Sequence, residues 1–174
     1  MAAFKQHGSL APASAPVLRK IILASSVTHV LMDAVQAASG FLTNASMPGD
    51  PVVGHVLSHV DKNGMGLLVS GAAGAAIGSY AGSFATASDN TTVAKVAGIV
   101  DVSKETLYSA SPDVAIGTTT GSNLFGYRID LADATQTDED TATFATAQYL
   151  IWEVDANTSS RHIVNIYESG IFGV

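Results

Sequence analysis

The sequence predicts a mainly β protein, an antiparallel β-barrel or sandwich of short strands with an extended N-terminal arm. Short apolar runs recur along most of the chain and are separated by turn-forming residues. Apolar and mixed positions alternate strictly over residues 51–60, as in a strand with two different faces. The composition, 47% hydrophobic but only 13% charged, is dominated by the small residues of β-rich surface and virion proteins.

Each apolar run has the length of a strand. We expect strands within residues 20–30, 40–42, 51–60, 66–70, 92–102, 107–110, 124–131, 148–154 and 162–167.

The alternating run 51–60 gives the most specific local prediction. It leads into Asp61-Lys62-Asn63-Gly64, and an Asn-Gly pair supplies the positive φ angles of a tight hairpin turn. Residues 65–70 would form the returning strand. A second hairpin is expected to join 149–154 to 163–167 through the polar turn 155–160.

Other segments do not read as regular strands. Residues 1–18 contain Pro12 and Pro16 among small residues and predict an extended arm, which leaves 19–174 as one β-rich domain. Residues 71–87 are rich in Gly and Ala and predict a long loop or a close-packed interface. Residues 133–146 predict a loop or a short helix with Thr137 as its N-cap. The apolar pair Ile171-Phe172 near the end would pack on the core or reach a neighbouring subunit.

Charge and composition exclude several classes of partner. A net charge of −7 and eight scattered Lys and Arg residues argue against nucleic acid, whose affinity comes from clustered cations. The chain has no Cys, so it can fold in a reducing cytoplasm without disulfides. The uncharged segment 63–88 has small residues at spacings seen in membrane helices, but it has few large apolar side chains, so we expect no membrane partner.

Three groups of residues weakly resemble metal-binding sites. His55 and His59 have a ligand-like spacing, but on a strand they would lie roughly 13 Å apart, so ordinary surface or interface histidines are expected. Asp138-Glu139-Asp140 predicts a solvated acidic loop, because adjacent carboxylates point in different directions. The turn at 61–64 lacks the glutamate that closes a calcium loop. We therefore expect no metal site and no cofactor.

Catalytic motifs are similarly weak. Gly78-Ser79-Tyr80-Ala81-Gly82 places its serine one position too early for a nucleophile elbow, and Gly71 and Gly74 lack the Gly-Lys-Ser/Thr ending of a phosphate loop. Sequons at Asn44, Asn90 and Asn157 are attributed to chance in loops crowded with Asn, Ser and Thr. The sequence therefore predicts no catalytic residue and no enzymatic activity.

The residues do carry a resemblance. The motifs in the first half are Asp33-Ala34-Val35, Ser39-Gly40-Phe41, Gly49-Asp50-Pro51-Val52-Val53-Gly54 and Asp61-Lys62-Asn63-Gly64. Those in the second half are Leu107-Tyr108-Ser109-Ala110, 116–124, Gly126-Tyr127-Arg128-Ile129-Asp130-Leu131 and the 149–167 hairpin. Together, over most of residues 20–174, they resemble the decoration (cement) proteins of tailed-phage capsids.

The resemblance implies a structural protein without catalytic residues. It would bind the major capsid protein on the outside of the virion, as a homo-oligomer and often a trimer, after synthesis in the host cytoplasm. It would tie neighbouring hexamers together. The alternative is another virion component, such as a tail tube, a fibre or a glycan-binding module. Glycan binding would favour a cluster of exposed aromatics, whereas Trp152 lies in an apolar run and is expected in the core.

Overall fold

A computed structural model describes residues 4–11, 15–24, 28–29, 31–60, 63, 80–81, 97–113, 125–138, 147–154 and 161–167. All regular structure in these residues is β, which confirms the predicted fold class. The strands are β1 (Lys5–Ser9), β2 (Leu18–Ile22), β3 (Thr28–His29), β4 (Ala34–Ala38), β5 (Phe41–Asn44), β6 (Gly54–Val60), β7 (Tyr80–Ala81), β8 (Ala97–Asp101), β9 (Thr106–Pro112), β10 (Arg128–Asp133), β11 (Gln136–Asp138), β12 (Tyr149–Val154) and β13 (His162–Ile166).

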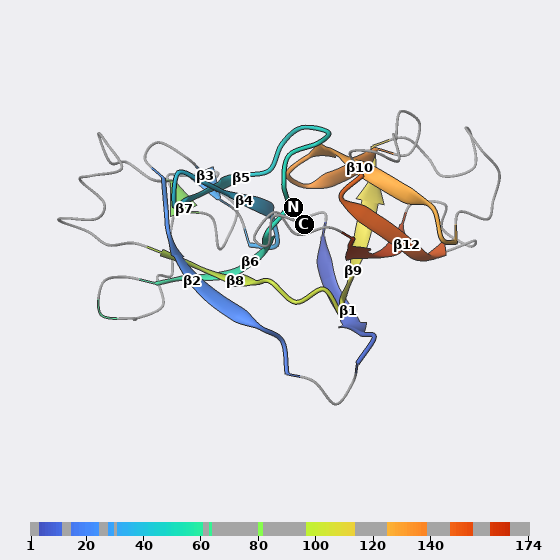
Figure 1. The fold of residues 1–174 in the computed structure, drawn as a ribbon, viewed down its shortest axis with the longest axis horizontal. Coiled ribbons are helices and arrows are strands. Elements are labelled where there is room, and N and C mark those ends of the chain that lie inside the picture. Colours follow the sequence, from blue (N-terminus) through green and yellow to red (C-terminus); the bar gives the residue numbers. More distant parts are fainter. Residues whose placement is uncertain are drawn as a thin grey trace, which may run out of the picture.

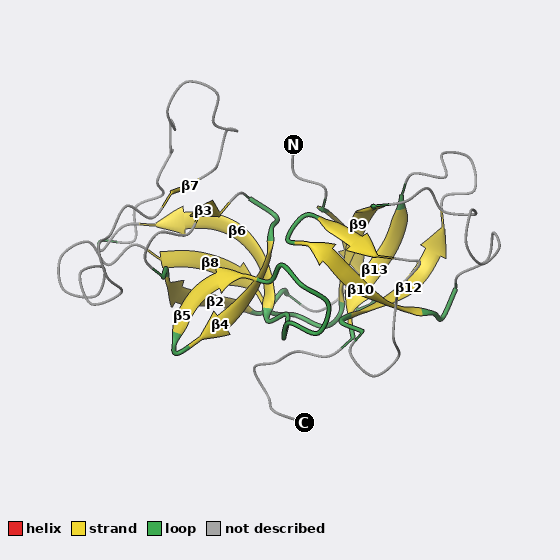
Figure 2. Cartoon of the chain, turned by 90° about the horizontal axis from the view of Figure 1, so that it is seen from above, coloured by secondary structure: helices red, strands yellow, loops and turns green. Residues whose placement is uncertain are grey.

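Most of the strands form two curled sheets that lie side by side (Figures 1 and 2), and β3 and β7 form a small separate sheet of their own. The first sheet has the order β2-β8-β6-β4-β5, and all of its ladders are antiparallel. It curls until its two outer strands meet at a single parallel bridge between Leu23 and Leu42, where the Ala24 N–H donates to the Leu42 carbonyl at 2.9 Å. We call this sheet the first barrel.

The second sheet closes completely. Strands β9, β13, β12, β10 and β11 follow one another around the ring, and β11 pairs in parallel with β9 to complete it. We call it the second barrel. β12 and β13 form the predicted hairpin, with Tyr149 opposite Ile166 and Val154 opposite His162.

The two barrels have the same connectivity. In each one, taken in chain order, the first strand lies next to the fifth, the fifth next to the fourth, the fourth next to the second and the second next to the third. In each one the first and third strands then meet in parallel. The halves of the chain therefore repeat one arrangement of strands, although their sequences show no repeat that we could recognise.

Tight turns fix the second-to-third strand hairpins of both barrels. β4 and β5 are joined by Ser39 and Gly40, whose φ angles of 51° and 83° are those of the two-residue turn that suits a twisted hairpin. β10 and β11 are joined by Ala134 and Thr135, and the Asp133 carboxylate accepts from both the N–H and the hydroxyl of Thr135 at 2.7 Å.

Strand β1 lies on the second barrel. It pairs antiparallel with β9, from Lys5 opposite Ser109 to Ser9 opposite Thr106, and Phe4 just before it is fully buried. Residues 4–9 of the predicted extended arm 1–18 therefore lie on the second barrel, where a single aromatic side chain anchors them to the core. Within the predicted β-rich region 19–174, ten of the strands form the two barrels, and β3 and β7 pair only with each other.

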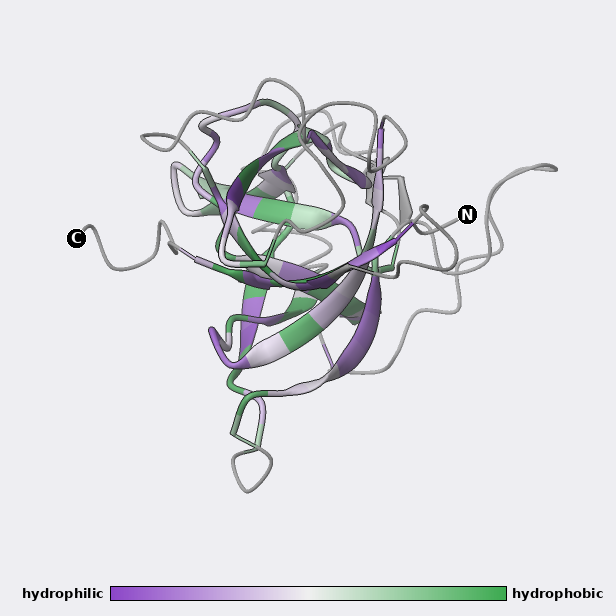
Figure 3. Cartoon of the chain, turned by 90° about the vertical axis from the view of Figure 1, so that its right-hand side faces the viewer, coloured by the Kyte–Doolittle hydropathy of each residue, from purple (hydrophilic) through white to green (hydrophobic). Residues whose placement is uncertain are grey.

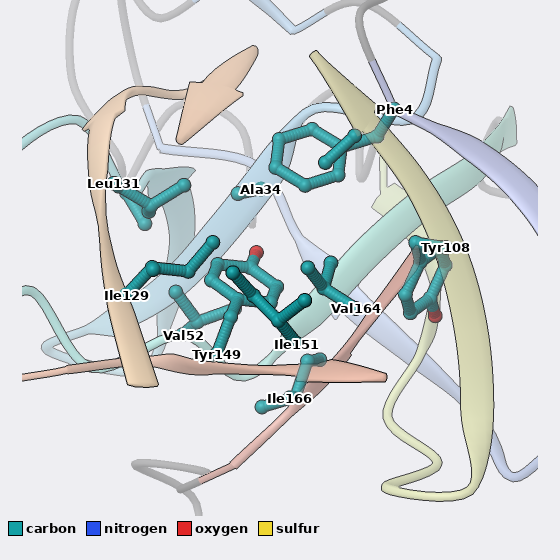
Figure 4. Close-up of a cluster of buried hydrophobic side chains, with 12 residues drawn as sticks. Phe4, Ala34, Val52, Tyr108, Ile129, Leu131, Tyr149, Ile151, Val164 and Ile166 are labelled. Carbon is teal, nitrogen blue, oxygen red and sulfur yellow. The ribbon is translucent and has the colours of Figure 1, made fainter. Parts of the chain in front are cut away.

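Two buried clusters form the core, and one of them spans both barrels. Leu23, Val35, Leu42, Val56 and Val100 fill the first barrel. The second cluster combines the interior of the second barrel with side chains from the N-terminal part of the chain, among them Phe4, Ala34 and Val52 (Figure 4). Hydrophobic and hydrophilic residues alternate along many strands (Figure 3), as expected for strands with one buried face.

Several sequence expectations fall on these strands. Parts of the runs at 20–30, 40–42, 51–60, 92–102, 107–110, 124–131, 148–154 and 162–167 are strands, as expected. β1, β4, β7 and β11 were not expected. The helix with Thr137 as N-cap is wrong, because Thr137 lies in β11.

The hairpin strand 65–70 and the terminal pair 171–172 lie outside the described residues, as does the segment 71–87 apart from β7. Among the residues that are described, no helix is long and apolar enough to span a membrane.

Candidate functional site

The most distinctive cluster of polar and aromatic side chains lies at the seam between the barrels. His55 comes from β6 of the first barrel and is completely buried. Its ring centroid lies 4.6 Å from that of Phe4 and 4.0 Å from that of Tyr108 in β9. The hydroxyl of Tyr149, in β12, lies 3.0 Å from His55 Nε2. Four distant segments therefore meet at one imidazole.

The hydrogen bonds of His55 assign its tautomer. Nδ1 lies 2.9 Å from the Met32 carbonyl oxygen, which can only accept, so Nδ1 carries the proton. Nε2 is then an acceptor, and the Tyr149 hydroxyl donates to it. Both ring nitrogens are satisfied by the neutral imidazole, and protonation would leave the tyrosine without its acceptor.

Burial also sets the charge state of the cluster. Burial lowers the pKa of His55 to about 4, against a smaller opposite effect of the Met32 carbonyl. Burial raises the pKa of Tyr149 well above its ordinary value, and the pKa of Tyr108 is raised by burial and by the Asp101 carboxylate. All three rings are therefore neutral near pH 7, so the cluster offers neither a charged nucleophile nor a poised general base.

Further polar contacts join the barrels around this cluster. The Gln148 amide donates to the carbonyls of Met47 and Asp50 at 3.2 and 3.0 Å, and its oxygen accepts from the Leu131 N–H at 2.9 Å. The Ala34 N–H donates to the Ala134 carbonyl at 2.8 Å. Backbone and side-chain bonds of this kind hold the two barrels as one body.

The connection between the barrels is similarly fixed. Asp101, the last residue of β8, is fully buried. Its carboxylate accepts from the Ser103 N–H at 2.9 Å and from the Thr106 hydroxyl at 2.8 Å. The Asp101 carboxylate thus holds the beginning and the end of the short turn that leads from the first barrel into β9.

The histidine pair departs from expectation. Both His55 and His59 are buried within the chain, although surface or interface positions were expected. The ladder between β6 and β8 shifts register between Val56 and Ser58, so the strict alternation of the sequence does not continue along the strand. Burial lowers the pKa of His59 to about 4. In the described part of the chain no three His, Asp or Glu side chains gather as a metal site would require.

The acidic segment Asp138-Glu139-Asp140 also departs from its predicted structure, a solvated loop. Asp138 is buried in β11 opposite Asp130, so it is not part of a solvated loop, while Glu139 and Asp140 lie outside the described residues. In the same strand the Thr137 hydroxyl lies 2.8 Å from His162 Nε2. The pKa of His162 is lowered to about 4 by burial and by the charge of Arg161.

Aromatic side chains gather at an exposed edge of the second barrel. Phe125 and Tyr127 are 62% and 47% exposed, on a turn that exchanges two backbone hydrogen bonds with Ile151. Trp152 is half-buried, contrary to the expected core position, and its ring lies edge-on to Phe125 at 6.1 Å. The indole N–H donates to Asn165 at 2.8 Å. Next to it the Arg128 guanidinium stacks on the Tyr167 ring at 3.8 Å.

Sequence reasoning missed Phe4, Tyr108 and Tyr149 as members of one cluster. One signal was present, because Phe4 is the first aromatic residue of the chain and the next is Phe41. Two sequence patterns weakly resembled a phosphate loop and a nucleophile elbow. Their residues, 71, 74 and 78–82, lie outside the described part of the chain except for β7. Comparison of this chain with protein-family models, curated proteins and solved structures gives no match.

Proposed function

We propose that this protein is a capsid decoration protein, which binds the outside of a phage head and bridges and stabilises its subunits. The partner in this proposal is the major capsid protein. The protein is made in the host cytoplasm as a homo-oligomer, most simply a trimer. The sequence resemblance supports this proposal, and so does the mainly β architecture.

One observation carries the proposal further than the resemblance does. In the part of the chain that the structure describes, the exposed large apolar side chains lie on connections and turns, except for Leu18 at the start of β2: they are Leu10, Val17, Leu18, Met47, Phe125 and Tyr127. The buried polar groups, in contrast, are enclosed within the fold, as His55 is. Contact surfaces for other proteins are marked by exposed apolar side chains that lie together, so these residues are the first candidates for the capsid contact.

The test uses phage shells that lack the protein. Purified protein is added, and binding is measured by co-sedimentation and shell stability by the temperature at which the shells open. We expect saturable binding and a higher opening temperature, because a ligand of the assembled state stabilises it by mass action. No binding by the full-length protein would overturn the proposal.

Matched variants locate the contact. Met47→Ser and Phe125→Ser remove exposed apolar side chains from the two barrels without touching the core. Lys104→Ser, at an exposed position on the connecting turn, is the control. We expect weaker shell binding by at least one of the first two variants and unchanged binding by the control.

The aromatic edge supports a second candidate, a glycan-binding module of a fibre or tail. Exposed Phe125 and Tyr127 beside Trp152 are the kind of cluster that stacks on sugar rings. Trp152 is the only tryptophan, so its fluorescence reports directly on this edge. Titration with a panel of host-surface glycans should change the emission if this candidate is right and leave it unchanged if it is wrong.

A further inference from the structure

Strand β1 differs from the other strands in how it is held. Within the described residues β9 is its one partner, and four of its five residues are exposed. Its attachment to the rest of the molecule consists of this ladder, the buried Phe4 ring and a bond from the Leu10 N–H to the Glu105 carbonyl at 2.8 Å. The strand is thus an edge addition with one aromatic anchor.

The site that receives β1 is built by other parts of the chain. The Phe4 ring lies 4.6 Å from His55 and stacks at 5.5 Å on Tyr149, which belong to β6 and β12. We call these two side chains the Phe4 pocket. Neither depends on β1 for its position, because His55 is fixed by Met32 and Tyr149 lies within the β10-β12-β13 ladders. A second copy of the strand would find the same pocket and the same edge of β9.

The segment that follows β1 allows it to reach such a second site. Leu10 is bound to Glu105, and the Val17 carbonyl accepts from the Val102 N–H at 2.9 Å. These two anchors on the connecting turn are three residues apart, which is at most about 11 Å. The six residues 11–16, Ala-Pro-Ala-Ser-Ala-Pro, could span about 20 Å. Fully extended, these six residues therefore exceed the separation of the two anchors on the connecting turn.

The two ends of this linker carry exposed apolar side chains. Leu10 is 41% exposed, and Val17 and Leu18 are 43% and 45% exposed. Three large apolar residues at the two ends of one linker are left in water when the strand folds back on its own chain. If the strands of two copies were exchanged, their linkers would run past each other, and these side chains could be buried against one another.

We propose that β1 is exchanged between copies of this chain, so that Phe4 of one copy occupies the Phe4 pocket of another and its β1 pairs with that copy's β9. The contacts within each site are the same as those seen in one chain, and the linker contacts are added. This exchange concerns the free protein, so it stands or fails independently of capsid binding.

The test takes advantage of the absence of cysteine in the natural chain. Gly8 and Leu107 are direct partners between β1 and β9, and a Cβ at Gly8 would meet nothing within 4 Å. The double variant Gly8→Cys, Leu107→Cys therefore places two thiols at a distance that suits a disulfide. A ¹⁵N-labelled and an unlabelled preparation are mixed in equal amounts, unfolded, refolded together and oxidised.

Mass spectrometry of the cross-linked peptide then distinguishes the two arrangements. With exchange, about half of the cross-linked peptides pair a labelled with an unlabelled strand, because random assembly mixes the copies. Without exchange every cross-linked peptide has a single label, and that result would overturn the proposal. Gly8→Cys paired with Phe125→Cys, on a turn outside the β1–β9 ladder, is the control for random collision.

A second measurement covers the case in which the thiols do not close. In a refolded mixture of ¹³C-labelled and unlabelled natural chains, an isotope-filtered experiment detects contacts between copies only. We expect an intermolecular signal between the rings of Phe4 and Tyr149, which lie 5.5 Å apart. Absence of that signal would contradict the exchange.

Discussion

The Tyr149 hydroxyl donates a hydrogen bond of 3.0 Å to His55 Nε2, and this bond links β12 of the second barrel to β6 of the first. Both side chains are completely buried. The bond requires a neutral imidazole, and it lies beside Phe4, the anchor of the N-terminal strand. The joining of the two barrels, the charge of one histidine and the attachment of β1 therefore depend on the same small region.

Removal of the tyrosine hydroxyl tests that bond. Tyr149→Phe should lower the free energy of unfolding by about 1–3 kcal/mol, because the buried His55 Nε2 loses its donor. Urea denaturation followed by Trp152 fluorescence measures the change. Tyr127→Phe, at an exposed position, should leave stability unchanged, and an equal effect of both substitutions would refute the importance of the bond.

Stability should depend on pH through the three buried histidines, His55, His59 and His162. Their pKa values are lowered from 6.5 to about 4 in the folded protein. Between these values the unfolded chain binds more protons than the folded one, so stability falls as the pH is lowered from 6.5 to 4. The histidines contribute no pH dependence above about pH 7.5, where neither state is protonated.

Melting curves recorded between pH 8 and pH 4 measure this dependence. His55→Gln should reduce the slope contributed by the histidines by roughly one third, whatever its effect on stability at pH 8. His7→Gln, in the exposed part of β1, is the matched control. A slope that His55→Gln leaves unchanged would show that this histidine is accessible to protons in the folded state.

The anchoring role of Phe4 predicts a large effect from a position near the chain terminus. Phe4→Ala should cost about 3–5 kcal/mol, the usual range for emptying a buried aromatic site. Phe125→Ala, which truncates a mostly exposed ring, should cost less than about 0.5 kcal/mol. Denaturant titration of both variants compares them directly. If the two costs were similar, Phe4 would not be part of the core.

Close packing at the start of β6 gives a steric prediction. A Cβ at Gly54 would lie 2.1 Å from the Asp101 carbonyl oxygen and 2.6 Å from a Val100 methyl group. Gly54→Ala should therefore destabilise the protein by about 1–3 kcal/mol, as overpacking does. Gly8→Ala, where a Cβ meets nothing within 4 Å, should have little effect. Thermal denaturation distinguishes the two, and a neutral Gly54→Ala would place β6 and β8 further apart than described.

The fold class and much of the strand content could be predicted from local sequence patterns. Alternation at 51–60 and the apolar runs at 149–154 and 162–167 predict strands, because burial of one face imposes a period of two on any strand. Strands of low intrinsic strand propensity could not be predicted, for a physical reason. β4 (Ala-Val-Gln-Ala-Ala) and β1 (Lys-Gln-His-Gly-Ser) contain few residues that favour strands, and they are held by their partners in the ladders.

Which residues share an environment depends on the packing of distant segments and could not be predicted from local patterns. Phe4, His55, Tyr108 and Tyr149 lie far apart in the chain, and no local pattern pairs them. His55 is buried because Phe4, Tyr108 and Tyr149 pack around it, and His59 lies beyond the register shift in β6, where the alternation of faces seen in the sequence no longer continues. The common connectivity of the barrels was hidden for a related reason: the pairing of strands depends on contacts between distant segments, which different sequences can provide equally well.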